Sequence, residues 1–235
     1  MPFTAATVRF FRGLRRNNVK SWFEAHRAEY ERDLRDPMRA LIEEMDTRLG
    51  RFAPEISGDP KRSMFRIYRD IRFSKDKSPY KTHAACWFHH RDADRRVGSE
   101  AEGGSAGFYF QVAPRGSFVG GGTWMPPRPV LNRIRDAIAE DPRGFERVVR
   151  APRLIRRFQG LSDEAVLKRM PRGFTEDHPA ARWLKYQSFV TGRMLTDRQV
   201  TSRRLPALLE EDFKAMLPLV RWLSGVLGLK PAEHR

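Results

Sequence analysis

The sequence predicts an α+β fold in which helices from both ends of the chain pack against a central, mainly antiparallel sheet. Helical periodicity dominates the first fifty residues or so, and short β-prone runs replace it in the middle of the chain. The helical period returns after Pro127 and Pro129. Helices grouped before and after the strands are typical of α+β rather than alternating α/β folds. We expect about four to six strands in a single domain spanning residues 1–235.

The composition is sufficient for one sizeable core. The chain has 235 residues, of which 40% are hydrophobic and 11% aromatic, and a domain of this size can bury much of its apolar surface. The formal net charge of +16 predicts attraction to anions such as nucleic acid, phosphorylated metabolites or acidic partners. The same charge is also compatible with a basic surface that has no specific site.

Cysteine content and hydropathy predict a cytoplasmic protein. The single cysteine, Cys86, rules out an intrachain disulfide and suits a reducing compartment. No apolar run approaches the roughly 18 residues that span a bilayer, and no secretory signal pattern is present. The basic N-terminus faintly resembles a transit peptide, but Val8, Phe11 and Leu14 fall at helical spacing and predict the first helix of the fold.

Three helices are predicted before the sheet. The first covers residues 4–16 and ends at Asn17. Asn18 is a candidate N-cap for a second helix over about residues 19–34. Asp36 and Pro37 predict an N-cap followed by proline at the first turn of a third helix. Its apolar stripe consists of Met38, Leu41, Ile42, Met45 and Leu49.

The middle and the end of the chain supply the strands and the remaining helices. We predict a loop over residues 54–62, a β-prone run over residues 64–68 and a strand over residues 82–90. A polar connection over residues 91–105 and a hairpin over residues 107–121 follow. Helices follow from Val130 and from Asp141-Pro142, and an irregular stretch covers residues 160–182. A strand over residues 186–194 and a long helix over residues 204–227 complete the chain, with Pro218 expected to kink or split that helix.

The most unusual segment spans residues 66–82. Residues 61–81 contain eight basic and two acidic side chains, and basic residues recur at every third position from Arg66 to Lys75. Guanidinium and hydroxyl groups together can cradle a phosphate or carboxylate. Asp70 and Asp76 could orient the cations or hold a metal. The alternative is an internal Arg–Asp network that closes the fold, and the segment lacks the glycine-rich pattern of a phosphate loop.

Three stretches resemble a family of bacterial and fungal proteins called domain of unknown function 2461. They are residues 17–31, which contain Asn-Asn-Val-Lys-Ser-Trp-Phe, residues 69–82, and Gly107-Phe108-Tyr109 together with Gly120-Gly121-Gly122-Thr123-Trp124. The similarity covers nearly the whole chain. It implies one intact domain and supports the choice of the central segment, but it implies no activity.

The candidate site joins this segment to polar and aromatic residues near the N-terminus. Tyr80 and His26 are the candidates for proton transfer, should any reaction occur. The predicted ligand-binding residues are Arg66, Arg69, Asp70, Arg72, Lys75, Asp76, Lys77, Tyr80, Lys81, Asn17, Asn18, Lys20, Trp22, His26 and Arg27.

Other constellations favour packing. Strand alternation places His83 and His89 on one face and Cys86 and His90 on the other, which is too few ligands per face for a closed zinc site. We assign no metal site and leave any cofactor open. Cys86 fits a small buried hydrophobe. The glycine run 120–122 could let a ligand approach backbone amides, but a glycine run at a strand end is more typical of a bulge or close packing. Trp22, Tyr30 and Trp124 could stack on a base or sugar, but such residues more often occupy core positions.

The leading functional hypothesis is a pocket for a phosphorylated or carboxylated small molecule, with or without catalysis. A nucleic-acid-binding protein is the first alternative, although no helix-turn-helix, zinc-finger or RNA-recognition pattern is present. A module that docks an acidic protein partner, with a purely structural Arg–Asp network, is the second. The sequence assigns no reaction type and no oligomeric state.

Overall fold

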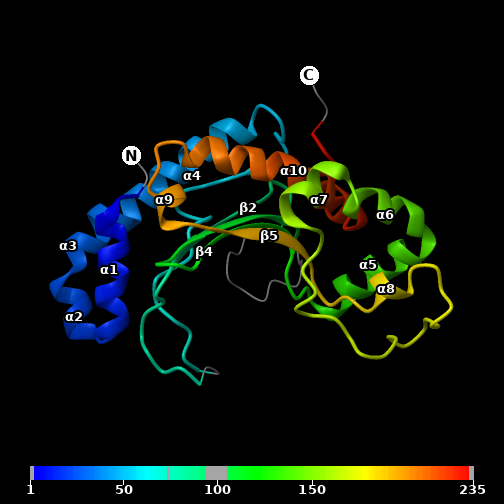
Figure 1. Cartoon of the computed structure of the whole chain (residues 1–235), viewed down its shortest axis with the longest axis horizontal. Helices are drawn as coiled ribbons and strands as arrows, with labels where there is room; N and C mark the ends of the chain where they lie inside the picture. Colours follow the sequence, from blue (N-terminus) through cyan, green and yellow to red (C-terminus); the bar gives the residue numbers. More distant parts are fainter. Residues whose placement is uncertain (1–2, 73–74, 94–104, 233–235) are drawn as a thin grey trace.

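An antiparallel five-stranded sheet, with its strands in the order of the chain, forms the centre of the molecule (Figure 1). The computed structural model describes residues 3–72, 75–93 and 105–232. In these ranges the predicted α+β fold is confirmed. The strands are β1 (Ile56–Ser57), β2 (Ala84–His90), β3 (Gly107–Val112), β4 (Ser117–Thr123) and β5 (Phe189–Leu195).

Helices from both ends of the chain surround the sheet. α4 and α10 lie on one face, above the strands in Figure 1. No helix in the described ranges has the length and apolar character needed to cross a membrane. The helical elements are α1 (Ala5–Arg16), α2 (Lys20–Ala25), α3 (Arg27–Tyr30), η1 (Glu31–Arg35), α4 (Asp36–Leu49), α5 (Arg128–Glu140), α6 (Pro142–Val149), α7 (Pro152–Phe158), α8 (Ala181–Leu184), α9 (Asp197–Val200) and α10 (Leu205–Val226).

The predicted second helix is wrong in its continuity and in its cap. Residues 20–35 form two short α-helices and a π-helical turn, η1, in place of one regular helix. The N-cap position of α2 belongs to Val19, because the Asn18 side chain bonds elsewhere. Asp36 is also not an N-cap. Arg35 before it already has helical dihedrals, so η1 runs directly into α4.

The predicted core of the helix layer is confirmed. All five residues of the apolar stripe of α4 are buried, and α10 runs through Pro218 as one helix, so the predicted split does not occur. Phe213 of α10 stacks on Phe108 of β3 at 4.4 Å. Burying these aromatic and aliphatic side chains between helix and sheet supplies much of the stability of the fold.

Several predicted boundaries need correction. The predicted loop over residues 54–62 contains β1, and α7 lies where no helix was predicted. The β-prone run 64–68 is not a strand of the sheet: Met64 forms an isolated bridge with Cys86 of β2, and Tyr68 forms one with Tyr80. Most of the predicted polar connection 91–105 lies outside the described residues. The expected core position of Trp124 is wrong: the residue follows β4 in a bend, and its side chain is exposed.

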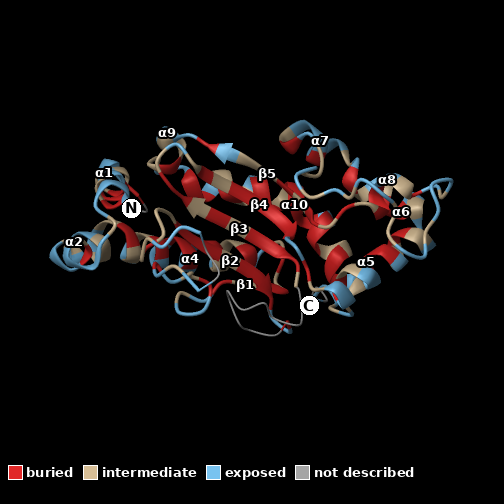
Figure 2. Cartoon of the chain, turned by 90° about the horizontal axis from the view of Figure 1, so that it is seen from below, coloured by how far each residue is buried: buried red, intermediate tan, exposed pale blue. Residues whose placement is uncertain are grey.

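The two faces of the sheet carry different side chains. Alternation along β2 directs Cys86 and Phe88 toward α4 and α10, whereas Ala85 and Trp87 occupy the opposite face. Tyr109 pairs with Trp87, and Phe118 pairs with Gln111, two residues after Tyr109. Tyr109 and Phe118 therefore also lie on that opposite face. Figure 2 views the sheet from this side, and no described helix passes in front of β3 and β4.

Candidate functional site

Residues 66–81, the basic arm, project from the body of the molecule. Two limbs pair antiparallel: the Arg69 amide donates to the Pro79 carbonyl at 2.9 Å, and the Lys81 amide donates to the Ile67 carbonyl at 2.8 Å. In Figure 1 the arm extends away from the sheet, on the side opposite α4 and α10. Arg66, Arg72 and Lys77 of the arm are exposed, whereas Ile67 and Tyr80 are buried.

The base of the arm is fixed to the N-terminal helices by one asparagine. The Asn18 amide nitrogen donates to the Tyr80 carbonyl at 2.9 Å, and the Tyr80 amide donates to the Asn18 side-chain oxygen at 3.1 Å. The Phe23 ring stacks on the Tyr80 ring at 4.2 Å. Burial raises the pKa of Tyr80. These contacts bring together two regions that the sequence analysis joined only by hypothesis, and Phe23 was not among the predicted residues.

The tip of the arm satisfies its own charges. The Arg72 guanidinium donates to both Asp70 carboxylate oxygens, at 3.1 and 2.7 Å, and Arg72 lowers the pKa of Asp70 to about 2. The Lys77 ammonium donates to the Ile71 carbonyl at 2.9 Å. Arg72, Lys75 and Lys77 are exposed, so solvent screens these contacts strongly. Ser74 lies outside the described residues.

The base of the arm concentrates positive charge in a less exposed setting. Lys81 and His83 are half-buried, and neither forms an ion pair within the described residues. Burial lowers the pKa of Lys81, and the neighbouring Arg66 and Arg69 lower it further. Burial also lowers the pKa of His83, with smaller contributions from Lys81 and Arg69. The exposed Arg66 and the half-buried Arg69, Lys81 and His83 are called the cation cluster below.

Arg69 has an unused donor. One guanidinium nitrogen lies 3.0 Å from the Asp76 carboxylate, but its Nε is buried and has no hydrogen-bond partner among the described residues. Asp76 itself also accepts from the Ser78 amide at 2.9 Å. A buried donor without an acceptor costs about 1–3 kcal/mol, so an acceptor supplied by a ligand would relieve this cost.

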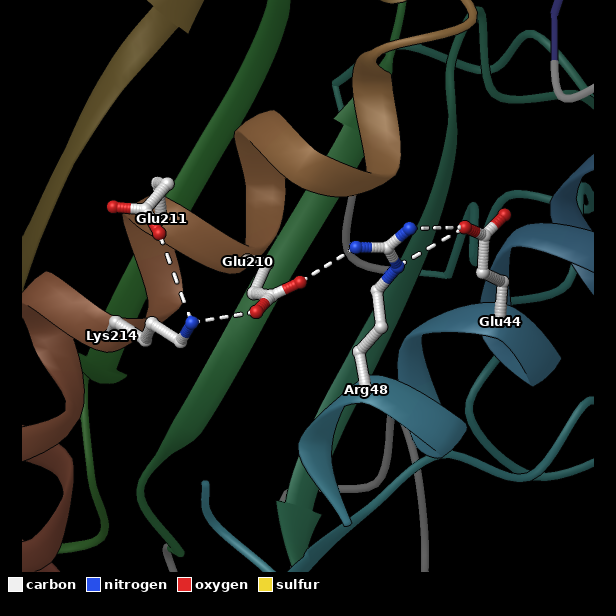
Figure 3. A network of polar contacts seen from close by, with 5 residues as sticks. All are labelled: Glu44, Arg48, Glu210, Glu211 and Lys214. Atoms are coloured by element: carbon white, nitrogen blue, oxygen red, sulfur yellow. Dashed lines mark hydrogen bonds and ion pairs between the residues drawn. The ribbon is translucent and has the colours of Figure 1, made fainter. Parts of the chain in front are cut away.

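The ion network between α4 and α10 shows how the rest of the molecule balances its charges (Figure 3). Arg48 contacts Glu44 at 2.8 Å and Glu210 at 2.6 Å, and Lys214 contacts Glu210 at 2.6 Å. Glu211 lies 3.8 Å from Lys214. Two cations there meet three carboxylates. In the cation cluster the two nearby carboxylates, Asp70 and Asp76, are already held by Arg72 and Arg69.

The other predicted residues near the N-terminus mostly contact their own helices. The Asn17 amide donates to the Gly13 carbonyl at 3.1 Å, and His26 stacks on Trp22 at 3.9 Å while its Nδ1 lies 2.8 Å from the Trp22 carbonyl. Lys20 is exposed. Arg27 forms two hydrogen bonds to Glu24, both at 2.9 Å, and lies close enough to Tyr68 for the phenol to contribute to its raised pKa.

The weaker constellations have structural explanations. Cys86 is fully buried, and burial raises the pKa of its thiol, which disfavours the nucleophilic thiolate. His90 is buried, with its Nε2 at 2.8 Å from the Lys230 carbonyl. Within residues 3–72, 75–93 and 105–232, no three His, Cys, Asp or Glu side chains are grouped to hold a metal. A Cβ on Gly121 would lie 2.9 Å from the Met216 sulfur, so this glycine serves close packing.

Sequence reasoning missed the aromatic residues beside the cation cluster. The Lys81 ammonium lies 5.4 Å from the centre of the Phe65 ring, and that ring lies 6.1 Å from the Tyr109 ring. Alternation along the strand also puts Trp87 on the same face as His83 and His89. The sequence does not show that β2 pairs with β3, and this pairing brings Tyr109 opposite Trp87.

Fold and site together define a basic α+β domain with a half-buried lysine, Lys81, beside two arginines at one end of its sheet. The chain belongs to the family described as conserved hypothetical protein (DUF2461), whose model matches residues 6–222. This confirms the resemblance found in the sequence. No curated protein and no solved structure matches the chain.

Proposed function

We propose that this protein binds a small phosphorylated or carboxylated anion at the base of the basic arm. Lys81 carries the proposal, because its half-buried ammonium lies among cations and has no carboxylate partner in the described residues. A cation that is desolvated and surrounded by like charges is held at a cost in free energy. Such costs are concentrated at functional sites, where a ligand of opposite charge offsets them.

The cluster also has suitable donors. Arg66 and Arg69 offer planar, permanently charged guanidinium groups, which bind phosphate and carboxylate with paired hydrogen bonds. Arg69 additionally has its unpartnered Nε. His83 would gain a proton on binding an anion, since the anion offsets the repulsion from Lys81 and Arg69. The proposal assigns binding only and no reaction.

This proposal moves the centre of the site from the tip of the arm to its base. Arg72 and Lys77 at the tip are exposed and bonded to groups within the arm, so they have less to gain from a ligand. Nucleic-acid binding through the overall charge of +16 remains the competing hypothesis. It predicts that affinity falls steeply with salt, because many counterions are released.

Isothermal titration calorimetry with ribose 5-phosphate and with citrate tests the proposal. We would compare the wild type with Lys81→Ala and with the control Lys61→Ala, which removes the same charge from an exposed position. Loss of a hydrogen bond to a charged group costs about 1.5–3 kcal/mol. We therefore expect Lys81→Ala to weaken one of the two probes at least about tenfold and Lys61→Ala to change it less than about twofold.

Two results would count against the proposal. Equal weakening by both substitutions would mean that net charge, not the cation cluster, attracts the anion. The proposal would also be contradicted if neither probe bound to the wild type at low salt. Circular dichroism of each variant establishes that the comparison is made on folded protein.

A further inference from the structure

A group of aromatic side chains occupies the sheet face opposite α4 and α10 without belonging to the core. Phe65, Trp87, Tyr109 and Phe118 are all half-buried. None of the four packs against the main hydrophobic core, which includes partly buried residues elsewhere such as Trp22 and Tyr30. Half-exposed aromatic rings that do not serve the core are candidates for contact with a ligand.

Two of these rings lie across the sheet instead of standing upright on it. Atoms of the Phe118 ring occupy the space where a Cβ of Gly120 or Gly192 would be, at 2.6 and 2.3 Å from the ideal positions. Two atoms of the Trp87 ring lie 3.0 Å from the ideal Cβ position of Gly107. The missing side chains of these glycines leave room for the two rings beside the backbone of the neighbouring strands.

The aromatic group adjoins the cation cluster. The Phe65 amide donates to the Ala85 carbonyl at 3.0 Å, so Phe65 lies beside Ala85 of β2. The Phe65 ring is the one that the Lys81 ammonium approaches. Trp87 is the next residue on that face, about 7 Å further along the strand. Trp87 has no stacking partner among the aromatic side chains of the described residues. One small molecule could therefore reach both the cations and this ring.

We propose that the ligand of this site is a nucleotide, with its phosphate at Lys81 and Arg66 and its base stacked on the ring of Trp87. The inference rests on the proposed anion-binding function and narrows it to anions that carry a flat aromatic ring. A free mononucleotide and a single-stranded oligonucleotide share this chemistry. Stacking contributes about 1–3 kcal/mol per base and accepts every base, because each has a π face.

The polar groups on this face predict little selectivity among bases. The Tyr109 hydroxyl donates to the Gln111 side-chain oxygen at 2.8 Å, and the Gln111 amide nitrogen donates to the Gly116 carbonyl at 2.7 Å. Both side chains are thus engaged with the protein. Specific base recognition requires hydrogen bonds to base edges, and this pair already uses its amide and hydroxyl donors internally.

Calorimetry at fixed ionic strength with adenosine 5′-monophosphate, uridine 5′-monophosphate and ribose 5-phosphate tests the inference. The three probes carry the same phosphate, and only the first two carry a base. We expect both nucleotides to bind about tenfold tighter than ribose 5-phosphate, the equivalent of about 1.4 kcal/mol. A single-stranded tetranucleotide with one terminal phosphate shows whether a polymer binds more tightly than the monomer.

Substitutions locate the contribution of the base. We expect Trp87→Leu to reduce the advantage of the nucleotides over ribose 5-phosphate to about twofold or less, while the affinity for ribose 5-phosphate is retained. Tyr68→Leu is the control, because Tyr68 is an exposed aromatic residue whose ring contacts are Phe23 and Tyr80. Phe118→Leu provides a second variant of the aromatic group if Trp87→Leu does not fold.

The outcomes separate the two proposals. Binding of ribose 5-phosphate with no gain from a base would overturn the nucleotide inference and leave the anion site standing. Failure of all phosphate probes, including the tetranucleotide, would overturn the nucleotide inference, and failure of citrate as well would remove both proposals. A base-dependent gain that survives in Trp87→Leu and Phe118→Leu would place the base elsewhere and contradict the inference.

Discussion

The two faces of the sheet contrast in how their side chains are covered. On the face toward α4 and α10, Phe88, Phe108 and Phe213 are fully buried and pack on one another. On the other face, Trp87 and Phe118 lie over glycines and stay half-buried. The covered face stabilises the fold, whereas the other face presents aromatic rings next to the cation cluster. The contrast teaches that in this molecule the side chains proposed to bind a ligand are those that the core does not use.

The largest expected effect concerns the covered face. Phe213→Ala removes a fully buried ring and should lower the free energy of unfolding by about 3–5 kcal/mol. Phe118→Ala on the other face should cost roughly half as much or less, because the ring is half-exposed and outside the core. Chemical denaturation of both variants measures the difference, and equal losses would contradict the distinction between the two faces.

A second test concerns the buried carboxylate of α10. Asp212 is fully buried and paired with Arg193, at 2.9 and 3.0 Å, and with Arg157. Asp212→Asn leaves two guanidinium groups without their counterion and should lower the free energy of unfolding by about 3 kcal/mol. Glu211→Gln, in an exposed ion pair with Arg153, should cost less than about 1 kcal/mol. A small effect for Asp212→Asn would mean that the helix layer tolerates unpaired cations, as the arm does.

The smallest expected change in stability concerns the attachment of the arm. Asn18→Ala removes both hydrogen bonds to the Tyr80 backbone and should cost about 1–3 kcal/mol. Hydrogen exchange should accelerate at the Tyr80 amide, which donates to the Asn18 side chain. Asn17→Ala removes an exposed contact within α1 and serves as the control. Unchanged exchange at Tyr80 would show that the arm is held by the Phe23 stacking alone.

The sequence predicted the helices and strands that have a clear apolar period. The buried stripe of α4, the β3–β4 hairpin and the cap of α6 at Asp141 agree with the structure. It did not predict the broken helix over residues 20–35, and it placed Asn18 as a cap although the Asn18 side chain bonds to Tyr80, 62 residues away. Such a long-range hydrogen bond leaves no local pattern. Prediction from the sequence also missed β1, which has only two residues.

For the candidate site, the sequence identified the segment but not which of its charges are free to bind. The ion pair of Arg72 with Asp70 and the hydrogen bond from Lys77 to Ile71 depend on how the tip folds back. Whether Lys81 is half-buried depends on the pairing of two limbs, Arg69 with Pro79 and Ile67 with Lys81. Phe23, Phe65 and His83 join the site only through tertiary packing.

The ammonium of Lys81 allows the most direct measurement. Its pKa can be followed by NMR of ¹³C-labelled lysine side chains, with and without sulfate, which keeps its charge over the pH range. In the free protein we expect a pKa below that of an ordinary exposed lysine, because burial, Arg66 and Arg69 disfavour the charged form. A bound anion stabilises the ammonium, so sulfate should raise this pKa, and sulfate affinity should fall as the pH rises through it. A pKa of Lys81 equal to that of exposed lysines and unchanged by sulfate would contradict an anion site at the base of the arm.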